Sequence, residues 1–206
     1  MISLSPRLKA VADAVRPGVK TCDVGSDHAY LPAYLYLNGV SSDICAADIA
    51  DEPLENARRT LIRYSLTDKI GLVKSDGLRN IDPDTREIVI AGMGGDLISR
   101  IIDAAPWTKN ADVHLVMQPM TRAAELRRYL FENGFDIREE RIAREGRRVY
   151  LIISAFYDGI VRGFSEEYYY FGLITPDTPD GAAFIEKQKK IITSKHMNPE
   201  EKEADE

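Results

Sequence analysis

A turn close to the N-terminus, residues 23–28, combines side chains that can do chemistry with a glycine that gives access to them. Gly25 allows a tight turn and a close approach between the backbone and a ligand. Asp27 and His28 stand where a pyrophosphate-binding loop has small residues. A carboxylate there repels a pyrophosphate but suits the cationic amino group of S-adenosylmethionine. The turn therefore predicts an S-adenosylmethionine site formed by Asp23, Gly25, Ser26, Asp27 and His28. The alternative is that Asp27 and His28 cap the helix that follows.

Two more carboxylates follow apolar runs that resemble buried strands. Asp48 lies 23 residues after Gly25, and an acidic side chain at that point accepts both ribose hydroxyls in NAD sites and S-adenosylmethionine sites alike. Asp76 precedes Gly77 after the next run, where it can reach the exocyclic amine of adenine, although an Asp-Gly turn has the same sequence. These positions predict a nucleoside without deciding which one.

Two later segments add candidates for the substrate side of the site. Gly92-Met93-Gly94 is followed by a third glycine, which removes side chains from a strand end and suits a backbone lying against a substrate; a flexible loop is the alternative. Gln118 offers both a donor and an acceptor for a base edge. Pro119, next to it, is explained by ending the strand alone.

These residues require an alternation of strands and helices. Apolar runs predict strands at 19–24, 44–49, 70–73, 87–91 and 113–117, and helical spacing predicts intervening helices, the strongest at 52–66. Residues 135–143 and 148–156 then form a hairpin around Glu145-Gly146-Arg147. The order predicts an α/β, Rossmann-like class I methyltransferase fold, a mostly parallel seven-stranded sheet with a terminal antiparallel hairpin. Dehydrogenase-type sheets usually finish all-parallel.

The character of the chain changes after the hairpin. We expect a methyltransferase domain over residues 1–160 and a small helical C-terminal region over 161–206. In that region, 175–181 is expected to be a loop, 182–195 a single short basic helix, and the acidic remainder disordered.

The net charge of −6 does not exclude an RNA partner, because residues 200–206 hold five carboxylates and one lysine and the rest carries only −2. Phosphate contacts need a local basic face. Residues 121–150 contain eight arginines against six acidic residues, and Arg122 and Arg147 are the candidates for substrate contact. A solvated, salt-bridged face explains the same composition.

Cys22 and Cys45 are predicted to be buried free thiols, since two cysteines make neither a disulfide framework nor a metal-ligand spacing. No stretch approaches the roughly 18 apolar residues of a membrane span. We therefore expect a cytoplasmic protein without a metal or a membrane, a monomer or weak dimer.

Together the motifs resemble the bacterial tRNA (adenine-22-N1)-methyltransferase family, known as TrmK. The matching segments are 4–8, 23–32, 47–49, 53–57, 75–78, 91–95, 118–120, 127–135 and 147–153. The resemblance covers residues 1–171 and implies a class I methyltransferase domain, followed by a coiled-coil domain that helps to hold tRNA. It implies methylation of adenine N1 at position 22. It also implies cofactor or active-site roles for Gly25, Asp27, His28, Asp48, Ile49, Asp76, Gly77 and Gly92 to Gly94. The C-terminal end departs from the family, because only one credible long helix is present.

The expected chemistry is direct attack of the neutral N1 lone pair on the sulfonium methyl group. Asp27 is expected either to stabilise the charge that N1 gains or to bind the methionine amine. Gln118 is expected to orient the base, and Tyr30 to offer a stacking face unless it is a core tyrosine. The sequence also allows two other functions: a nicotinamide-dependent oxidoreductase, and a non-catalytic RNA- or nucleotide-binding protein on the same fold.

Overall fold

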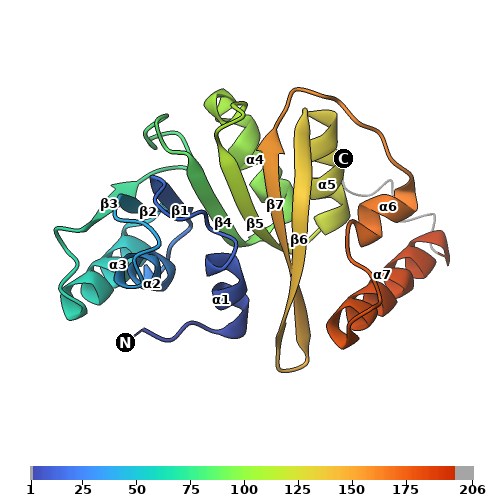
Figure 1. The fold of residues 1–206 in the computed structure, drawn as a ribbon, viewed down its shortest axis with the longest axis horizontal. Coiled ribbons are helices and arrows are strands. Elements are labelled where there is room, and N and C mark those ends of the chain that lie inside the picture. Colours follow the sequence, from blue (N-terminus) through green and yellow to red (C-terminus); the bar gives the residue numbers. More distant parts are fainter. Residues whose placement is uncertain (1, 198–206) are drawn as a thin grey trace.

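The computed structural model describes residues 2–197, which contain one seven-stranded sheet in the order β3-β2-β1-β4-β5-β7-β6 (Figure 1). Its strands are β1 (Thr21–Val24), β2 (Ile44–Asp48), β3 (Ile70–Lys74), β4 (Glu87–Gly94), β5 (His114–Thr121), β6 (Phe135–Glu145) and β7 (Arg148–Tyr157). The first five are parallel, and β7 runs antiparallel to both β5 and β6. The predicted fold class is confirmed.

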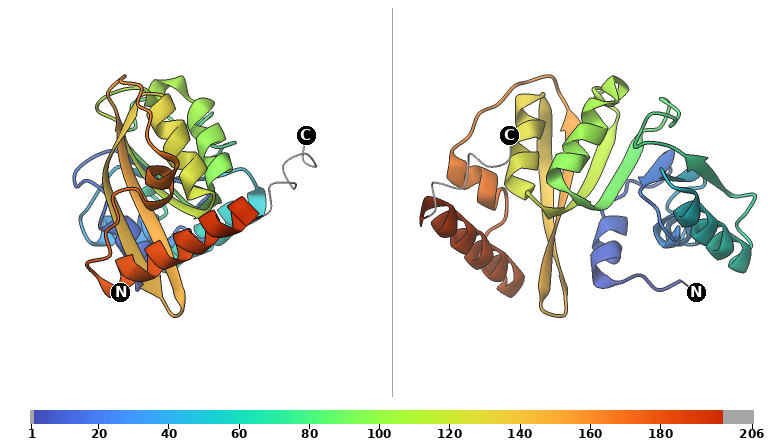
Figure 2. Two further views of the ribbon diagram at one scale, coloured as in Figure 1. Left: turned by 90° about the vertical axis from the view of Figure 1, so that its right-hand side faces the viewer. Right: turned by 180° about the vertical axis from the view of Figure 1, so that it is seen from behind.

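Helices cover both faces of the sheet (Figure 2). On one face α1 (Pro6–Ala12), α2 (Tyr30–Leu37) and α3 (Asp51–Arg63) bury an apolar cluster that includes Val11, Leu35 and Leu61. On the other face α4 (Gly95–Asp103), α5 (Ala123–Glu132) and a short 3₁₀ turn at Pro106–Thr108 enclose a second cluster around Ile98 and Phe131. Right-handed crossovers between parallel strands require this two-sided cover. None of the described helices has the length and apolar character needed to cross a membrane.

The β6–β7 hairpin reaches past the carboxyl ends of the parallel strands (Figure 1). β7 pairs with β5 only from Ile153 to Phe156, whereas its pairing with β6 continues out to Arg148. The outer part of the hairpin, residues 141–152, is therefore a two-stranded arm beside the edge where a ligand binds in an open α/β sheet.

Two strands are longer than the sequence indicates. β4 continues through Gly92 and Gly94, with shifts of register around Met93, because Gly92 adopts a left-handed φ of 84° that bulges the strand without ending it. β5 continues past Gln118 to Thr121. Gly92 and Gly94 are thus strand backbone and Gly95 begins α4, so the glycine run is not a free loop.

The C-terminal region holds two helices, α6 (Glu166–Phe171) and α7 (Pro179–Met197), where one was expected. Ser165 caps α6 by accepting from the Tyr168 N–H at 3.2 Å. Thr178 caps α7, accepting from the Gly181 N–H at 3.0 Å, and Pro179 takes the first helical position. The helix therefore begins inside the segment expected to be a loop. The acidic end at 198–206, for which the sequence predicts disorder, lies outside the described residues.

A buried ion pair joins this region to the sheet. Arg127 and Glu140 are 2.7 Å apart with both side chains fully buried. Arg127 also donates to the carbonyls of Tyr169 and Tyr170 at 2.7 and 3.1 Å. Glu140 accepts from the Leu173 N–H at 2.7 Å. We call this group the clasp; it ties α6 and the residues after it to α5 and β6.

Candidate functional site

The turn after β1 is shaped by Gly25 and closed by Met93. Gly25 has φ 77°, and a Cβ placed on it would lie 2.2 Å from the Met93 methyl carbon. The N–H groups of Gly25 and Ser26 both donate to the Ala47 carbonyl of β2, at 2.8 and 3.1 Å. The end of β4 therefore packs directly against the end of β1, which brings two of the predicted cofactor segments together.

Asp23 lies beneath this turn as a buried carboxyl group, with Ser26 as its hydrogen-bond partner. Burial raises its pKa from 3.8 to about 7, the Ser26 hydrogen bond opposes that rise, and the charge of Asp48 adds to it. Near neutral pH, Asp23 is thus divided between a protonated and an ionised form.

Asp27 and His28 point outward and do not cap α2. The cap position of α2 is Ala29, with φ 51° and no side-chain hydrogen bond to the helix, so the capping alternative is wrong. The Asp27 side chain is 60% exposed and lies 3.3 Å from His28 Nε2, and its other oxygen accepts from Asn56 at 3.3 Å. An exposed carboxylate at a strand end is open to a cationic ligand group.

The loops after β2 and β3 place further predicted residues at the same edge. Asp48 accepts from the Ala50 N–H at 3.0 Å, and Ile49 beside it is exposed. Asp76 forms an exposed ion pair with Arg79 at 2.9 Å. Gly77 has φ 59°, and a Cβ there would come within 3.0 Å of Ile101. The carboxyl ends of three adjacent strands thus each carry an aspartate.

The structure places Gln118 differently from the expectation that it binds a base edge. Its side chain is fully buried, its Oε1 accepts from Arg7 Nη1 at 2.8 Å, and its Nε2 donates to the Pro119 carbonyl at 3.0 Å. With both ends of the amide engaged, Gln118 is suited to holding Arg7. That arginine also stacks over the Tyr150 ring at 5.7 Å and is the nearest neighbour of a Cβ placed on Gly92, at 3.7 Å.

Arg7 extends the predicted site, because the sequence alone leaves two alternatives for it: a contact with the cofactor carboxylate if the first helix folds over the site, or a surface arginine. Ser5 and Pro6 begin α1, where Ser5 Oγ accepts a hydrogen bond from the Leu8 N–H and Pro6 takes the first helical position. Because α1 begins at the carboxyl edge, the residue after Pro6 is directed to the ends of β4 and β5.

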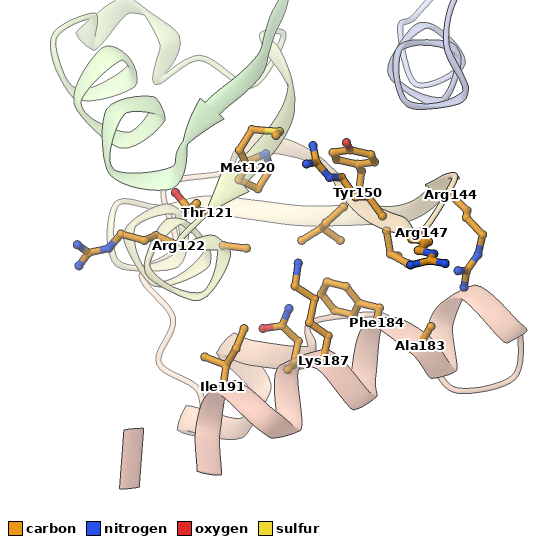
Figure 3. A pocket seen from close by; sticks show the side chains of 16 residues that line it. Met120, Thr121, Arg122, Arg144, Arg147, Tyr150, Ala183, Phe184, Lys187 and Ile191 are labelled. Carbon is orange, nitrogen blue, oxygen red and sulfur yellow. The ribbon is translucent and has the colours of Figure 1, made fainter. Parts of the chain in front are cut away.

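A groove of about 620 Å³ opens between the end of β5, the hairpin arm and α7 (Figure 3). Tyr150 and Phe184 contribute aromatic surface, and Lys187 points from α7 towards the hairpin. Its basic lining residues are Arg122, Arg144, Arg147, Arg148 and Lys187, and it has no acidic one. We call it the arginine groove. Arg122 and Arg147, 25 positions apart in the sequence, therefore line one surface.

The basic residues of the groove differ in how far they are neutralised. Arg144 pairs with Asp180 at 2.5 Å and Arg122 with Asp96 at 2.9 Å. Arg147, Arg148 and Lys187 have no carboxylate partner among residues 2–197. This favours the phosphate-binding alternative over a salt-bridged face for these three.

The profile of the methyltransferase domain family matches residues 4–153 of the chain. A Bacillus subtilis tRNA (adenine(22)-N(1))-methyltransferase is 35% identical over 167 residues, which are 77% of this chain and 70% of the relative.

Solved structures agree over nearly the whole chain. The crystal structure of the B. subtilis m1A22 tRNA methyltransferase TrmK has a TM-score of 0.83 at 30% identity and covers 100% of this chain and 91% of that one. A Streptococcus pneumoniae protein solved in complex with S-adenosyl-L-methionine has a TM-score of 0.82 at 32% identity, covering 95% and 91%.

Proposed function

The chain belongs to the tRNA (adenine(22)-N(1))-methyltransferase family, and on this premise we propose that it methylates N1 of adenine 22 in tRNA, using S-adenosylmethionine. The observation that supports this best is that the carboxyl edge of the sheet has an acidic part and a basic part. Aspartates lie at the ends of β1 to β3, left-handed glycines follow β1 and β3, and an arginine-lined groove lies beyond β5.

The donor set at the first part of this edge suits S-adenosylmethionine. A ligand with a cationic amine, two ribose hydroxyls and an adenine amine fits carboxylates on three successive loops. We propose as cofactor contacts Asp23, Gly25, Ser26, Asp27, His28, Asp48, Ile49, Asp76, Gly77, Gly92, Met93 and Gly94. Arg7, held by Gln118, is placed to pair with the ligand's carboxylate. When bound, the cofactor supplies an electrophilic methyl group on sulfur.

The protein's task in the reaction is positioning. The N1 lone pair of adenine is neutral at physiological pH and needs no prior deprotonation, so alignment at about 3–3.5 Å supplies most of the rate. N1 becomes cationic as it gains the methyl group, and the exposed Asp27 carboxylate stabilises that charge. Gln118 acts as a positioning residue through Arg7.

The tRNA approaches, in this proposal, from the side of the arginine groove. Arg147, Arg148 and Lys187 contact phosphates, while Arg122 lies where the groove meets the end of β5. The exposed ring of Tyr30, at the opposite side of the turn, offers a stacking surface to RNA.

The test is one incubation of purified protein with unmodified tRNA and S-adenosylmethionine, followed by nucleoside mass spectrometry. We expect N1-methyladenosine, and its loss when adenine 22 is replaced by guanine. Cofactor binding shown by calorimetry, without any N1-methyladenosine, would contradict the proposal and favour a non-catalytic binding protein.

A further inference from the structure

A second, smaller hollow lies on the other side of the cofactor turn, away from the arginine groove. It measures about 280 Å³ and is lined by His28, Tyr30, Asn56, Arg59, Thr60 and Arg63, which we call the α3 cleft. Its volume is at the lower end of ligand pockets, about 300 Å³. The cleft therefore has room for one nucleotide-sized group.

One wall of the α3 cleft is aromatic and exposed. The rings of His28 and Tyr30 stack at 5.3 Å with an interplanar angle of 22°. The His28 side chain is 47% exposed and Tyr30 is 43% exposed. Rings that are half-exposed and roughly parallel offer a face on which a nucleobase can stack, and such stacking tolerates any base.

Another part of the lining is cationic, because Arg59 and Arg63 lie one helical turn apart on α3 and no acidic residue lines the cleft. Arg59 has a distant ion pair with Glu55, 3.9 Å, and Glu55 is shared with Arg58 at 3.5 Å. Arg63 has no carboxylate partner among residues 2–197; its guanidinium lies 5.8 Å from the centre of the Tyr64 ring. The unpaired guanidinium of Arg63 and the weakly paired one of Arg59, beside a stacking face, match the two parts of a nucleotide.

Asn56 connects this cleft to the proposed reaction centre. Its side chain lines the cleft and donates to Asp27 at 3.3 Å. Anything seated against the aromatic and cationic parts of the lining lies immediately next to the carboxylate assigned to the target base.

We propose that the α3 cleft binds one unpaired nucleotide of the tRNA next to the target adenine, its base stacked on the His28–Tyr30 wall and its phosphate on Arg59 and Arg63. This rests on the proposed function. The bound neighbour prevents the strand from closing again after the target base is unstacked, a step that costs a few kcal/mol.

The test compares two double variants of equal charge change, Arg59→Ala/Arg63→Ala and, as the control, Arg58→Ala/Lys69→Ala, whose exposed residues are outside the cleft. Filter binding gives tRNA affinity at several salt concentrations, and steady-state kinetics give KM and kcat. We expect the cleft variant to weaken tRNA binding about tenfold and, because one phosphate contact is lost, to lower the slope of log K against log salt by about 1. Binding of S-adenosylhomocysteine should be unchanged in both variants.

A second pair of variants separates stacking from charge. Tyr30→Ala should raise the KM for tRNA, and Tyr30→Phe should restore it, because only the ring is needed. Identical tRNA affinity and salt slope in the cleft variant and its control would overturn the inference. If the wild-type protein binds tRNA but produces no N1-methyladenosine, the proposed function fails whatever the variants do.

Discussion

The two ends of the sheet edge differ in charge and in how that charge is held. At β1 to β3, the aspartates sit on short loops fixed by backbone hydrogen bonds. Beyond β5, the arginines sit on a hairpin arm and on a helix. The first part is confined to short, hydrogen-bonded loops and suits a small ligand; the second extends over the hairpin arm and α7 and suits a polyanion. A net charge of −6 conceals this division entirely.

The largest effect is expected when the clasp, which ties the C-terminal region to α5 and β6, is removed. Arg127→Met leaves Glu140 buried without its cation, which costs about 3–5 kcal/mol of the free energy of unfolding. Urea denaturation followed by circular dichroism measures it. Arg128→Met, which removes a partly exposed pair with Glu166, is the control and should change stability by less than about 1 kcal/mol. Equal effects in the two variants would contradict a structural role for the clasp.

The acidic part is tested next through Asp27→Ala. Loss of a preorganised electrostatic contact predicts a fall in kcat of about 100-fold or more. Calorimetry with S-adenosylhomocysteine distinguishes the two possible roles of Asp27. Weakened binding assigns Asp27 to the ligand amine, and unchanged binding assigns it to the methylated base. Unchanged turnover would contradict both roles.

The basic part is tested by Arg147→Ala/Arg148→Ala, which removes two cations that have no ion-pair partner in the described chain. We expect tRNA affinity to fall about tenfold and the salt slope to decrease by about 2, with cofactor binding unchanged. Arg100→Ala/Lys109→Ala, exposed and away from the groove, should leave both quantities as in the wild type. A loss of cofactor affinity in the groove variant, with tRNA affinity unchanged, would contradict the assignment of the arginine groove to tRNA.

The smallest expected effect concerns pH and Asp23. Its pKa is raised in the folded state, to about 7 from 3.8, so its contribution to stability is present below pH 3.8 and is lost as the pH rises through about 7. Asp23→Asn should therefore become more stable relative to the wild type between pH 6 and pH 7, by about 1 kcal/mol. Thermal unfolding at pH 5, 6, 7 and 8 measures this. A stability difference that does not vary with pH would contradict the raised pKa.

Much of this site could be predicted from the sequence because strand ends are visible in it. The turn 23–28, Asp48 and Asp76 each follow an apolar run, and the carboxyl ends of parallel strands share one edge. The partner of Gln118 could not be predicted, because Arg7 is 111 positions away and reaches it only once α1 has packed against the sheet.

The C-terminal helices show a different limit. α6 has the same serine cap as α1, and α7 has a threonine followed by proline, so both starts were visible as short local signals. The groove itself was not, since it depends on how far β7 extends beyond β5 and on where α7 lies against the hairpin. Register and docking of this kind are set by tertiary packing and not by local residue types.

The clasp couples the evolution of the C-terminal region to that of two charged residues in the methyltransferase domain. Arg127 lies on α5 and Glu140 on β6, yet their remaining hydrogen-bonding capacity is met by the backbone of Tyr169 to Leu173. A Cβ at Gly172 would come within 2.1 Å of the Glu140 carboxylate. A lineage that shortens or exchanges its C-terminal region before Gly172 must therefore replace both charges as well, and one that keeps them retains this short stretch of chain even where α7 diverges.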